Sequence, residues 1–445
     1  MAGFKINAFL IMLAGYTILG YSFMLLRVPP VDFGAPIGEV LLLIFLLSTN
    51  LPLFLDRLGK TIPLTPLALF WGLASVRLVV GFASYGMWAL RDASHFLNSL
   101  FILVGFVLAG NRENWEKLWR WFPMMLIVAS LYSFTFIWGE AIRAGSPTLS
   151  GASGQLVPIF GVFASGANVL LVTAIYLMVD GEASKRRWSL PFAMACLAFA
   201  FIIFQARTTY FQLVVLMALL FLYRRGAMPR LLILAPVFFV AVAIIMVFDF
   251  KIPGRIADQI SFGFFFDHIL ASFGISGSED VSGAAYGVDQ RLSWWRDALG
   301  RLFSDPVSTF TGLGYGIPLV QNFVNAEGVA VREPHNSIVS VLSRLGVLGL
   351  TAFLALNLVL FRAGVQCMAQ MRRRGWRQWE DRLLVMFAYF AVTFVMALTE
   401  DAFEKPYLTI PYYAFWGFVL RLHYETKRVT AEDRAAHPGV AEAKA

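Results

Sequence analysis

The chain is predicted to be an all-α polytopic membrane protein with about twelve transmembrane helices. Of its 445 residues, 58% are hydrophobic and only 14% are charged, whereas about 25% of the residues of a soluble domain are charged. The apolar residues fall into long runs of about 20, the length at which a helix crosses a bilayer. Membrane barrel strands are shorter and alternate in polarity, so these runs indicate helices.

The predicted spans follow each other closely, with one long interruption. The first nine fall within residues 1–250, at 6–26, 36–55, 64–83, 93–110, 118–139, 156–179, 188–205, 208–224 and 230–250. A loop domain at 251–336, expected to contain short amphipathic helices, separates them from the last three. These lie within 337–429, at 337–361, 384–400 and 405–422. Residues 430–445, rich in alanine and charge, are expected to form a cytoplasmic tail.

Lysine and arginine in the loops predict the orientation. If the N-terminus is cytoplasmic, most basic residues of the short loops fall on the cytoplasmic side, as the positive-inside rule requires. Both termini are then cytoplasmic. The net charge of +8 is scattered over short loops, which argues against nucleic-acid binding. Several ionisable residues far apart in sequence share the outer side, where no ATP is available: Arg91, Asp92, Arg207, Arg291, His335, Glu400 and Asp401.

The segment 289–349 carries the most informative polar pattern. It includes Arg291-Leu-Ser-Trp-Trp-Arg296-Asp297, expected to begin a helix on the membrane surface, and Glu333-Pro334-His335-Asn336, where a new apolar run starts. An imidazole is well suited to accept a proton near neutral pH, so His335 is the candidate catalytic base. The alternative is an ordinary helix start with an interfacial histidine, capped by Asn336 or Ser337.

Two arginines are candidates for holding a pyrophosphate. Arg207 lies in a short outer connector, where arginine is disfavoured, and Arg291 opens the amphipathic segment. The alternative is that both are interfacial residues whose heads reach toward water. Four residues are supporting candidates: Asn336, Arg91, Asp92 and Asp401. Asp92 and the neighbouring pair Glu400 and Asp401 could orient His335 or bind sugar, or they could merely end helices.

Other polar positions favour structural roles. Arg344, inside an apolar run, is expected to pair with a buried carboxylate, and Gly312, Gly314 and Gly316 are expected to form turns in a flexible loop. The five histidines are not spaced as metal ligands, so no metal site is predicted.

The order of these motifs resembles the O-antigen ligase and polymerase superfamily of bacterial envelope proteins. The matching positions are Gln205-Ala206-Arg207-Thr208, Arg291-x-x-x-Trp295, Gly312-Leu-Gly314-Tyr-Gly316, His335-Asn336-Ser337-Ile338 and Gly346-x-x-Gly349. The family's more usual Ser-Arg pair is Ala206-Arg207 here, which leaves out one hydroxyl contact.

The resemblance implies a metal-independent, inverting glycosyltransferase that needs no cofactor. It implies that glycan passes from undecaprenyl pyrophosphate to an acceptor hydroxyl, such as that of lipid A–core, at the periplasmic face of the bacterial inner membrane. Arg207 and Arg291 would bind the pyrophosphate and His335 would activate the acceptor. The favoured prediction is a ligase, with a polymerase joining carrier-linked repeats as the alternative. A transporter or flippase without chemistry is the alternative from another class.

Overall fold

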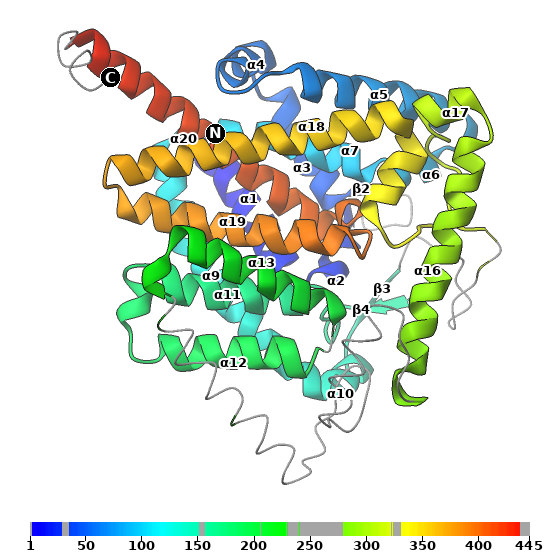
Figure 1. Cartoon of the computed structure of the whole chain (residues 1–445), viewed down its shortest axis with the longest axis horizontal. Helices are drawn as coiled ribbons and strands as arrows, with labels where there is room; N and C mark the ends of the chain where they lie inside the picture. Colours follow the sequence, from blue (N-terminus) through cyan, green and yellow to red (C-terminus); the bar gives the residue numbers. More distant parts are fainter. Residues whose placement is uncertain are drawn as a thin grey trace.

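The computed structural model describes residues 2–28, 35–150, 156–204, 206–227, 229, 240, 279–321, 323 and 331–436. The chain is mostly helical (Figure 1). The helices of its first half are α1 Ala2–Ile18, α2 Tyr21–Met24, α3 Ile37–Leu47, α4 Leu51–Gly59, α5 Thr65–Tyr85, α6 Met87–Asp92, α7 Ser94–Ser99, α8 Phe101–Leu108, α9 Arg112–Phe134, η1 Thr135–Trp138, α10 Gly139–Ala144, α11 Gly166–Val179, η2 Ala183–Lys185, α12 Ser189–Ile202, α13 Arg207–Tyr223 and η3 Arg225–Ala227.

The remaining described helices are α16 Glu279–Phe303, α17 Pro306–Thr311, α18 Ser337–Arg373, α19 Arg377–Ala397, η5 Ala402–Glu404 and α20 Pro406–Ala436. Two short antiparallel pairs accompany them: β1 Arg27–Val28 with β2 Ala35–Pro36, and β3 Thr148–Ser150 with β4 Leu156–Pro158. Figure 1 shows α18, α19 and α20 running roughly alongside each other, with α16 crossing one end of this group.

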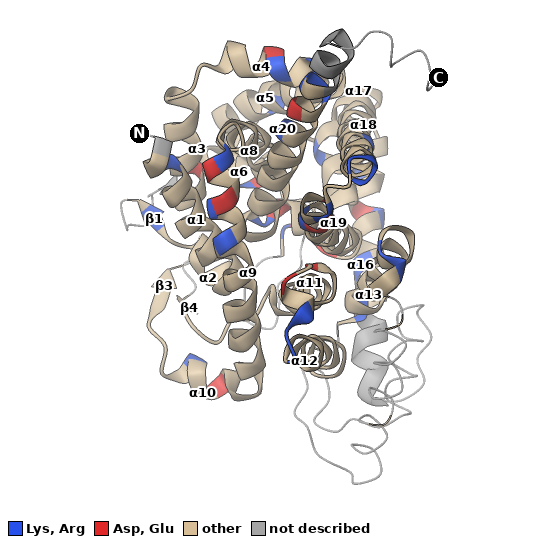
Figure 2. Cartoon of the chain, turned by 90° about the vertical axis from the view of Figure 1, so that its left-hand side faces the viewer, with Lys and Arg blue, Asp and Glu red and all other residues tan. Residues whose placement is uncertain are grey.

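Apolar helices of spanning length confirm part of the predicted architecture and indicate a membrane protein. Among the described residues, three are long and apolar enough to cross a bilayer: Thr65–Tyr85, Arg112–Ala144 (α9 with η1 and α10) and Ser337–Arg373. Shorter apolar helices include α11, α12 and α13. Figure 2 shows the charged residues as isolated positions among long uncharged stretches. Twelve complete spans are not seen, and the run 230–250 lies outside the described residues except for position 240.

Several predicted spans are broken. The run 6–26 divides at Gly20, whose positive φ of 55° ends the line of α1. The run 36–55 divides into α3 and α4, which are bent by 92°, and Asn50 caps the new helix by accepting from Leu53 N. The run 156–179 begins as strand β4, and its helix starts only at Gly166. A polar cap or glycine inside an apolar run stops a helix even where the lipid environment favours one.

Two further observations concern the loop domain and the tail. The amphipathic helix expected to start at Arg291 begins at Glu279 and is 25 residues long, so it is not a short helix. Residues 251–278 lie outside the described part. The last helix, α20, continues to Ala436, well into the segment predicted as a tail.

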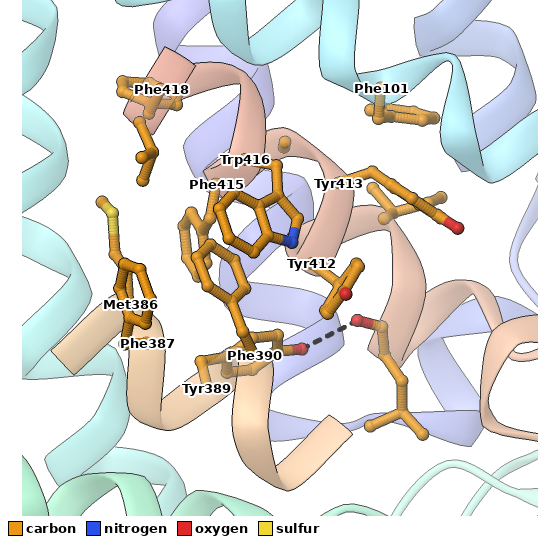
Figure 3. Close-up of a cluster of buried hydrophobic side chains, with 14 of the residues drawn as sticks. Phe101, Met386, Phe387, Tyr389, Phe390, Tyr412, Tyr413, Phe415, Trp416 and Phe418 are labelled. Carbon is orange, nitrogen blue, oxygen red and sulfur yellow. Dashed lines mark hydrogen bonds between the residues drawn. The ribbon is translucent and has the colours of Figure 1, made fainter. Parts of the chain in front are cut away.

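An aromatic core between α19 and α20 fixes the two helices that flank the site (Figure 3). Phe390 and Trp416 stack with ring centroids 3.9 Å apart, and Tyr389 donates to the Leu408 carbonyl. On the other side, α20 and α8 are so close that only glycine fits at position 105. A Cβ there would lie 1.9 Å from the Ala414 carbonyl oxygen. Glycines of this kind let membrane helices come into backbone contact.

Candidate functional site

His335 lies in the turn immediately before α18, in a conformation that the sequence holds locally. Its φ is 51°, and it is the one non-glycine residue with positive φ in the described part of the chain. Asn336 is the N-cap of α18, as predicted, and accepts hydrogen bonds from Ile338 N and Val339 N. Its side-chain amide donates to the Leu398 carbonyl at 2.8 Å. Asn336 therefore both caps α18 and binds the end of α19, and so it holds the neighbouring His335 there. The positive φ of His335 costs on the order of 1–3 kcal/mol of backbone strain.

The imidazole of His335 faces two carboxylates that follow α19. Its Nδ1 lies 3.2 Å from Glu400 Oε2 and 3.3 Å from Asp401 Oδ1. Asp401 is paired in turn with Lys405 Nζ at 2.9 Å. With Nδ1 turned to the carboxylates, the neutral ring would carry its proton there and leave Nε2 as the acceptor. This is the tautomer that a base acting through Nε2 requires.

The carboxylates change the protonation state expected of this histidine. Burial alone would lower the pKa of His335, but the hydrogen bonds and charges of Asp401 and Glu400 outweigh it and raise the pKa to about 9. Burial acts to raise the pKa of Glu400, yet His335, Lys405 and Arg291 bring it down to about 2. A pKa of about 9 favours the protonated ring at neutral pH, so His335 must first lose a proton before it can act as a base.

Arg291 reaches the same carboxylate from α16. Its guanidinium donates to the Thr399 carbonyl and to Glu400 Oε1, both at 2.8 Å. Trp294 and Trp295 lie three and four positions later, on the same side of the helix. The Trp294 ring packs 5.6 Å from the His335 ring, and Trp295 Nε1 donates to the Pro334 carbonyl. One face of α16 therefore positions both the arginine and the turn that carries His335.

Arg207 completes the group from the start of α13. Its neighbour Thr208 shares a 2.7 Å hydrogen bond with the Thr399 hydroxyl, and Arg291 binds the carbonyl of the same threonine. The charges of Arg291 and Glu400 both act on the Arg207 guanidinium. The three residues predicted to carry the chemistry thus gather around Thr399 and Glu400, although 128 positions separate the outermost two in the sequence.

The charge balance of this group favours an anionic ligand. Four cationic groups (Arg207, Arg291, Lys405 and protonated His335) surround two carboxylates, Glu400 and Asp401. The group as a whole then carries a net charge of +2. Side chains of Arg291 and His335 remain 30% and 32% exposed, so a ligand can reach them. Guanidinium groups in this arrangement are suited to the oxygens of phosphate or pyrophosphate.

A metal ion is a weaker fit for the same residues. Ligand atoms of His335, Glu400 and Asp401 lie within 4.8 Å of one another, a grouping that could hold a cation. The sequence did not predict it, because His335 lies 65 positions before the adjacent pair Glu400 and Asp401. However, Arg291 and Lys405 already bind these carboxylates, and a cation placed there would meet their charges at close range.

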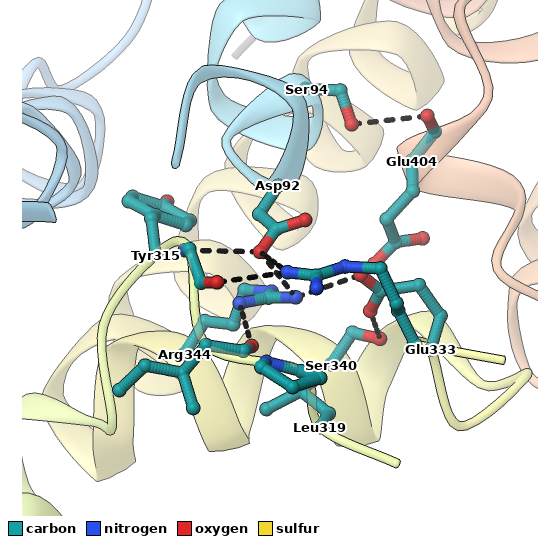
Figure 4. A network of polar contacts seen from close by, with 12 residues as sticks. Asp92, Ser94, Tyr315, Leu319, Glu333, Ser340, Arg344 and Glu404 are labelled. Carbon is teal, nitrogen blue, oxygen red and sulfur yellow. Dashed lines mark hydrogen bonds and ion pairs between the residues drawn. The ribbon is translucent and has the colours of Figure 1, made fainter. Parts of the chain in front are cut away.

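One supporting candidate, Asp92, lies in a different network, which Figure 4 shows. Asp92, with 1% of its side chain exposed, pairs with fully buried Arg344 at 2.9 Å and accepts from Gly316 N at 3.0 Å. Arg344 also binds Glu333 at 2.7 Å, which confirms that its role is to pair with buried carboxylates. Arg91 lies over the Trp88 ring at 5.1 Å. Asp92 therefore does not orient His335, because Arg344 and the Gly316 backbone occupy its carboxylate.

The glycine loop before α18 is clamped rather than flexible. Arg77 donates to the Gly312 carbonyl, and Arg344 donates to the carbonyls of Gly314 and Ile317. A Cβ on Gly312, where φ is 81°, would lie 2.1 Å from the Arg344 carbonyl oxygen. The loop therefore needs glycine for close backbone approach. The loop connects α17 to the following segment and packs against α18, and its contacts with Arg344 hold α18 in place next to His335.

Some residues of the site were ranked low or missed from sequence. Glu400 was considered from the sequence as a carboxylate that could orient His335 or bind sugar, or merely end a helix, but it was not among the supporting candidates; it contacts both Arg291 and His335. Thr399 and Lys405 carried no signal beyond their position after an apolar run. Glu404 lies between the two networks, where Ser337 donates to its carboxylate at 2.6 Å. Burial and the charges of Asp401 and Glu333 raise the pKa of Glu404 to about 8.

A cavity of about 970 Å³ opens beside this group. Its walls come from η1, α10, the loop before α11, the start of α11, the connection from α12 to α13, the start of α13, the end of α19 and the segment from there to the start of α20. Glu400 and Lys405 belong to both the cavity wall and the His335 group. The volume lies near the upper end of the range of ligand sites, roughly 300–1,000 Å³.

Comparisons with known proteins bring no assignment: a scan against protein-family models finds no match, and a search of curated proteins finds no relative. The resemblance to the O-antigen ligase and polymerase superfamily accordingly stays a prediction from the motif residues.

Proposed function

We propose that this protein is an O-antigen ligase-like glycosyltransferase of the bacterial inner membrane. It transfers glycan from undecaprenyl pyrophosphate to an acceptor hydroxyl, of lipid A–core or a similar glycolipid, at the periplasmic face. The observation that carries the proposal is the meeting of Arg207, Arg291 and His335 around Glu400. The order of the motif residues is the second support.

The chemistry follows from the charges and the tautomer of the site. Arg207 and Arg291 bind the pyrophosphate and stabilise the charge that grows on it as it leaves. His335, once neutral, accepts the acceptor's hydroxyl proton at Nε2. The hydroxyl oxygen attacks the anomeric carbon, whose bond to the pyrophosphate oxygen breaks with its electron pair, so the configuration inverts. Glu400 and Asp401 stabilise the imidazolium that results, as a carboxylate does beside a catalytic histidine.

A purified-protein assay tests this function directly. Protein in detergent is incubated with lipid-linked glycan and acceptor glycolipid extracted from the native host, without nucleotide or ion gradient. We expect glycan to appear on the acceptor, with release of undecaprenyl pyrophosphate. Absence of product with intact protein and both substrates would contradict an enzyme and favour a carrier. In a knockout strain, accumulation of carrier-bound polymer indicates a ligase, and acceptors bearing single repeats indicate the alternative, a polymerase.

The rate of transfer should rise with pH between about 7 and 9. The base form of His335 is the deprotonated one, and its pKa is raised to about 9, so kcat/KM of the free enzyme should increase as pH approaches that value. Glu400→Gln removes one of the two carboxylates that raise the pKa and should move the rise toward lower pH. Initial rates measured from pH 6 to 10 check this, and a flat profile, or a shift to higher pH in Glu400→Gln, would argue against His335 as the base.

A further inference from the structure

We infer that Lys405 is a positioning residue for His335, because the two cations share the same oxygens of Glu400 and Asp401. By taking part of the attraction of these oxygens, Lys405 limits how firmly they hold the proton of the imidazole. The inference rests on the proposed function only for the use of His335 as a base. The effect of Lys405 on the imidazole is a separate property, which can be measured without any transfer.

One oxygen of each carboxylate lies between the imidazole and the lysine. Asp401 Oδ1 is 3.3 Å from His335 Nδ1 and 2.9 Å from Lys405 Nζ. Glu400 Oε2 is 3.2 Å from the same Nδ1 and 4.0 Å from the same Nζ. A proton on the imidazole therefore gains the attraction of both carboxylates but meets the repulsion of the ammonium group beyond them.

The turn η5 holds Lys405 in this place. It brings the lysine back to Asp401, four positions earlier in the chain. Ser337 fixes the same turn to the start of α18, because its hydroxyl accepts from Phe403 N at 2.9 Å and its N–H donates to the Glu400 carbonyl at 3.2 Å. Since this serine follows the histidine by two positions, the lysine and the imidazole are held by one short frame.

The electrostatics of Asp401 agree with this sharing. Burial acts to raise the pKa of Asp401, but Lys405 and His335 together lower it well below its usual value. The other charged groups around the imidazole come from different elements and are unchanged when only Lys405 is replaced. They are Arg291 on α16, Arg207 on α13, Glu333 with its partner Arg344, and Glu404, which is bound by Ser337. A change in the imidazole after replacement of Lys405 therefore reports on the lysine.

The alternative role of Lys405 is to bind a substrate directly, because it also lines the cavity. A lysine that only binds substrate would affect KM and leave the protonation of His335 as it is. A lysine that acts through the carboxylates would change the protonation of His335 and leave KM nearly unchanged. The two roles are therefore separated by experiment.

Chemical modification of His335 tests the inference without any substrate. Diethyl pyrocarbonate reacts with the neutral imidazole, so the initial rate at which the His335 peptide is modified, followed by mass spectrometry near neutral pH, measures the deprotonated fraction. In Lys405→Met the carboxylates attract the imidazole proton alone, so the rate should fall about tenfold, as for a pKa raised by about one unit. Lys405→Arg retains the charge and should stay within about threefold of the wild-type rate. Arg296→Met removes an exposed charge from α16 and should leave the rate unchanged.

The outcomes separate this inference from the proposed function. If His335 is modified as fast in Lys405→Met as in the wild type, Lys405 does not act on the imidazole and the inference is wrong. Slower modification in a protein that transfers no glycan would support the inference and refute the transferase. Where transfer occurs, kcat/KM of Lys405→Met should rise at a pH about one unit higher than in the wild type, with KM for both substrates within about twofold.

Two further results would overturn the inference. A raised KM with an unmoved pH profile would mark Lys405 as a substrate ligand. Lys405→Gln is a second neutral variant, in case Lys405→Met does not fold. If neither neutral variant folds while Lys405→Arg does, the lysine serves the fold rather than the imidazole.

Discussion

Replacing Arg291 with Ala should reduce glycan transfer about 100- to 1,000-fold, the usual effect of removing one group that stabilises charge in a transition state. Arg291 contacts Glu400 from α16 and lies beside Arg207, so its loss halves the proposed pyrophosphate site. Arg296→Ala is the matched control, because Arg296 is exposed on the same helix, and it should stay within about twofold. Initial rates of the purified variants, with both substrates near saturation and then limiting, provide the measurement.

Arg291→Lys separates charge from geometry. Lysine retains the positive charge but not the planar fork that binds two oxygens together, so it should recover only part of the rate. Inorganic pyrophosphate should inhibit the wild-type protein in competition with the lipid-linked donor and should inhibit Arg291→Ala much less. Equal inhibition of both proteins, or a rate for Arg291→Ala close to that of Arg296→Ala, would show that Arg291 does not bind the pyrophosphate.

The gathering of Arg207, Arg291 and His335 was predictable from the sequence only in part. The distribution of lysine and arginine places all three on one side of the membrane, but it places Arg91 and Asp92 there too. That rule supplies one coordinate, the depth in the membrane, and says nothing of position within the membrane plane. The structure supplies the position within the membrane plane. There α16 and α19 bring Arg291 to Glu400, whereas α6 and α18 bring Asp92 to Arg344.

Local signals predicted helix ends better than apolar length did. Asn336 or Ser337 was expected to cap the helix that starts there, and Asn336 does so, accepting from the first backbone amides of α18. The run 36–55 contains the same kind of cap, but its high overall hydropathy led to the prediction of one continuous span. Asn50, followed by Pro52, in fact starts α4 after a bend of 92°. The start of α16 was missed because residues 279–290 are too polar to show an apolar period.

The second large effect expected is on stability: Asp92→Ala should destabilise the protein by about 3–5 kcal/mol. Asp92 and Arg344 are 1% and 0% exposed, and their side chains lie 2.9 Å apart. Removing the carboxylate leaves a buried guanidinium with only Glu333 as its ionic partner and frees Gly316 N. The loop that ends at His335 is then less firmly held. Thermal inactivation in detergent, followed as the half-life at a fixed temperature, measures the loss.

Two controls show whether burial of the charge is the cause. Asp297→Ala breaks an exposed ion pair with Arg301, 3.3 Å long and on α16, and should cost less than about 1 kcal/mol. On a Glu333→Gln background, the double variant Asp92→Ala/Arg344→Met removes the rest of the Asp92–Arg344–Glu333 charge triad, so it should be more stable than Asp92→Ala on the same background. If Asp92→Ala unfolds no faster than Asp297→Ala, the Asp92–Arg344 pair does not hold the loop. If the double variant regains stability but not transfer, Arg344 acts on the site by placing the turn of His335 rather than by stabilising the fold alone.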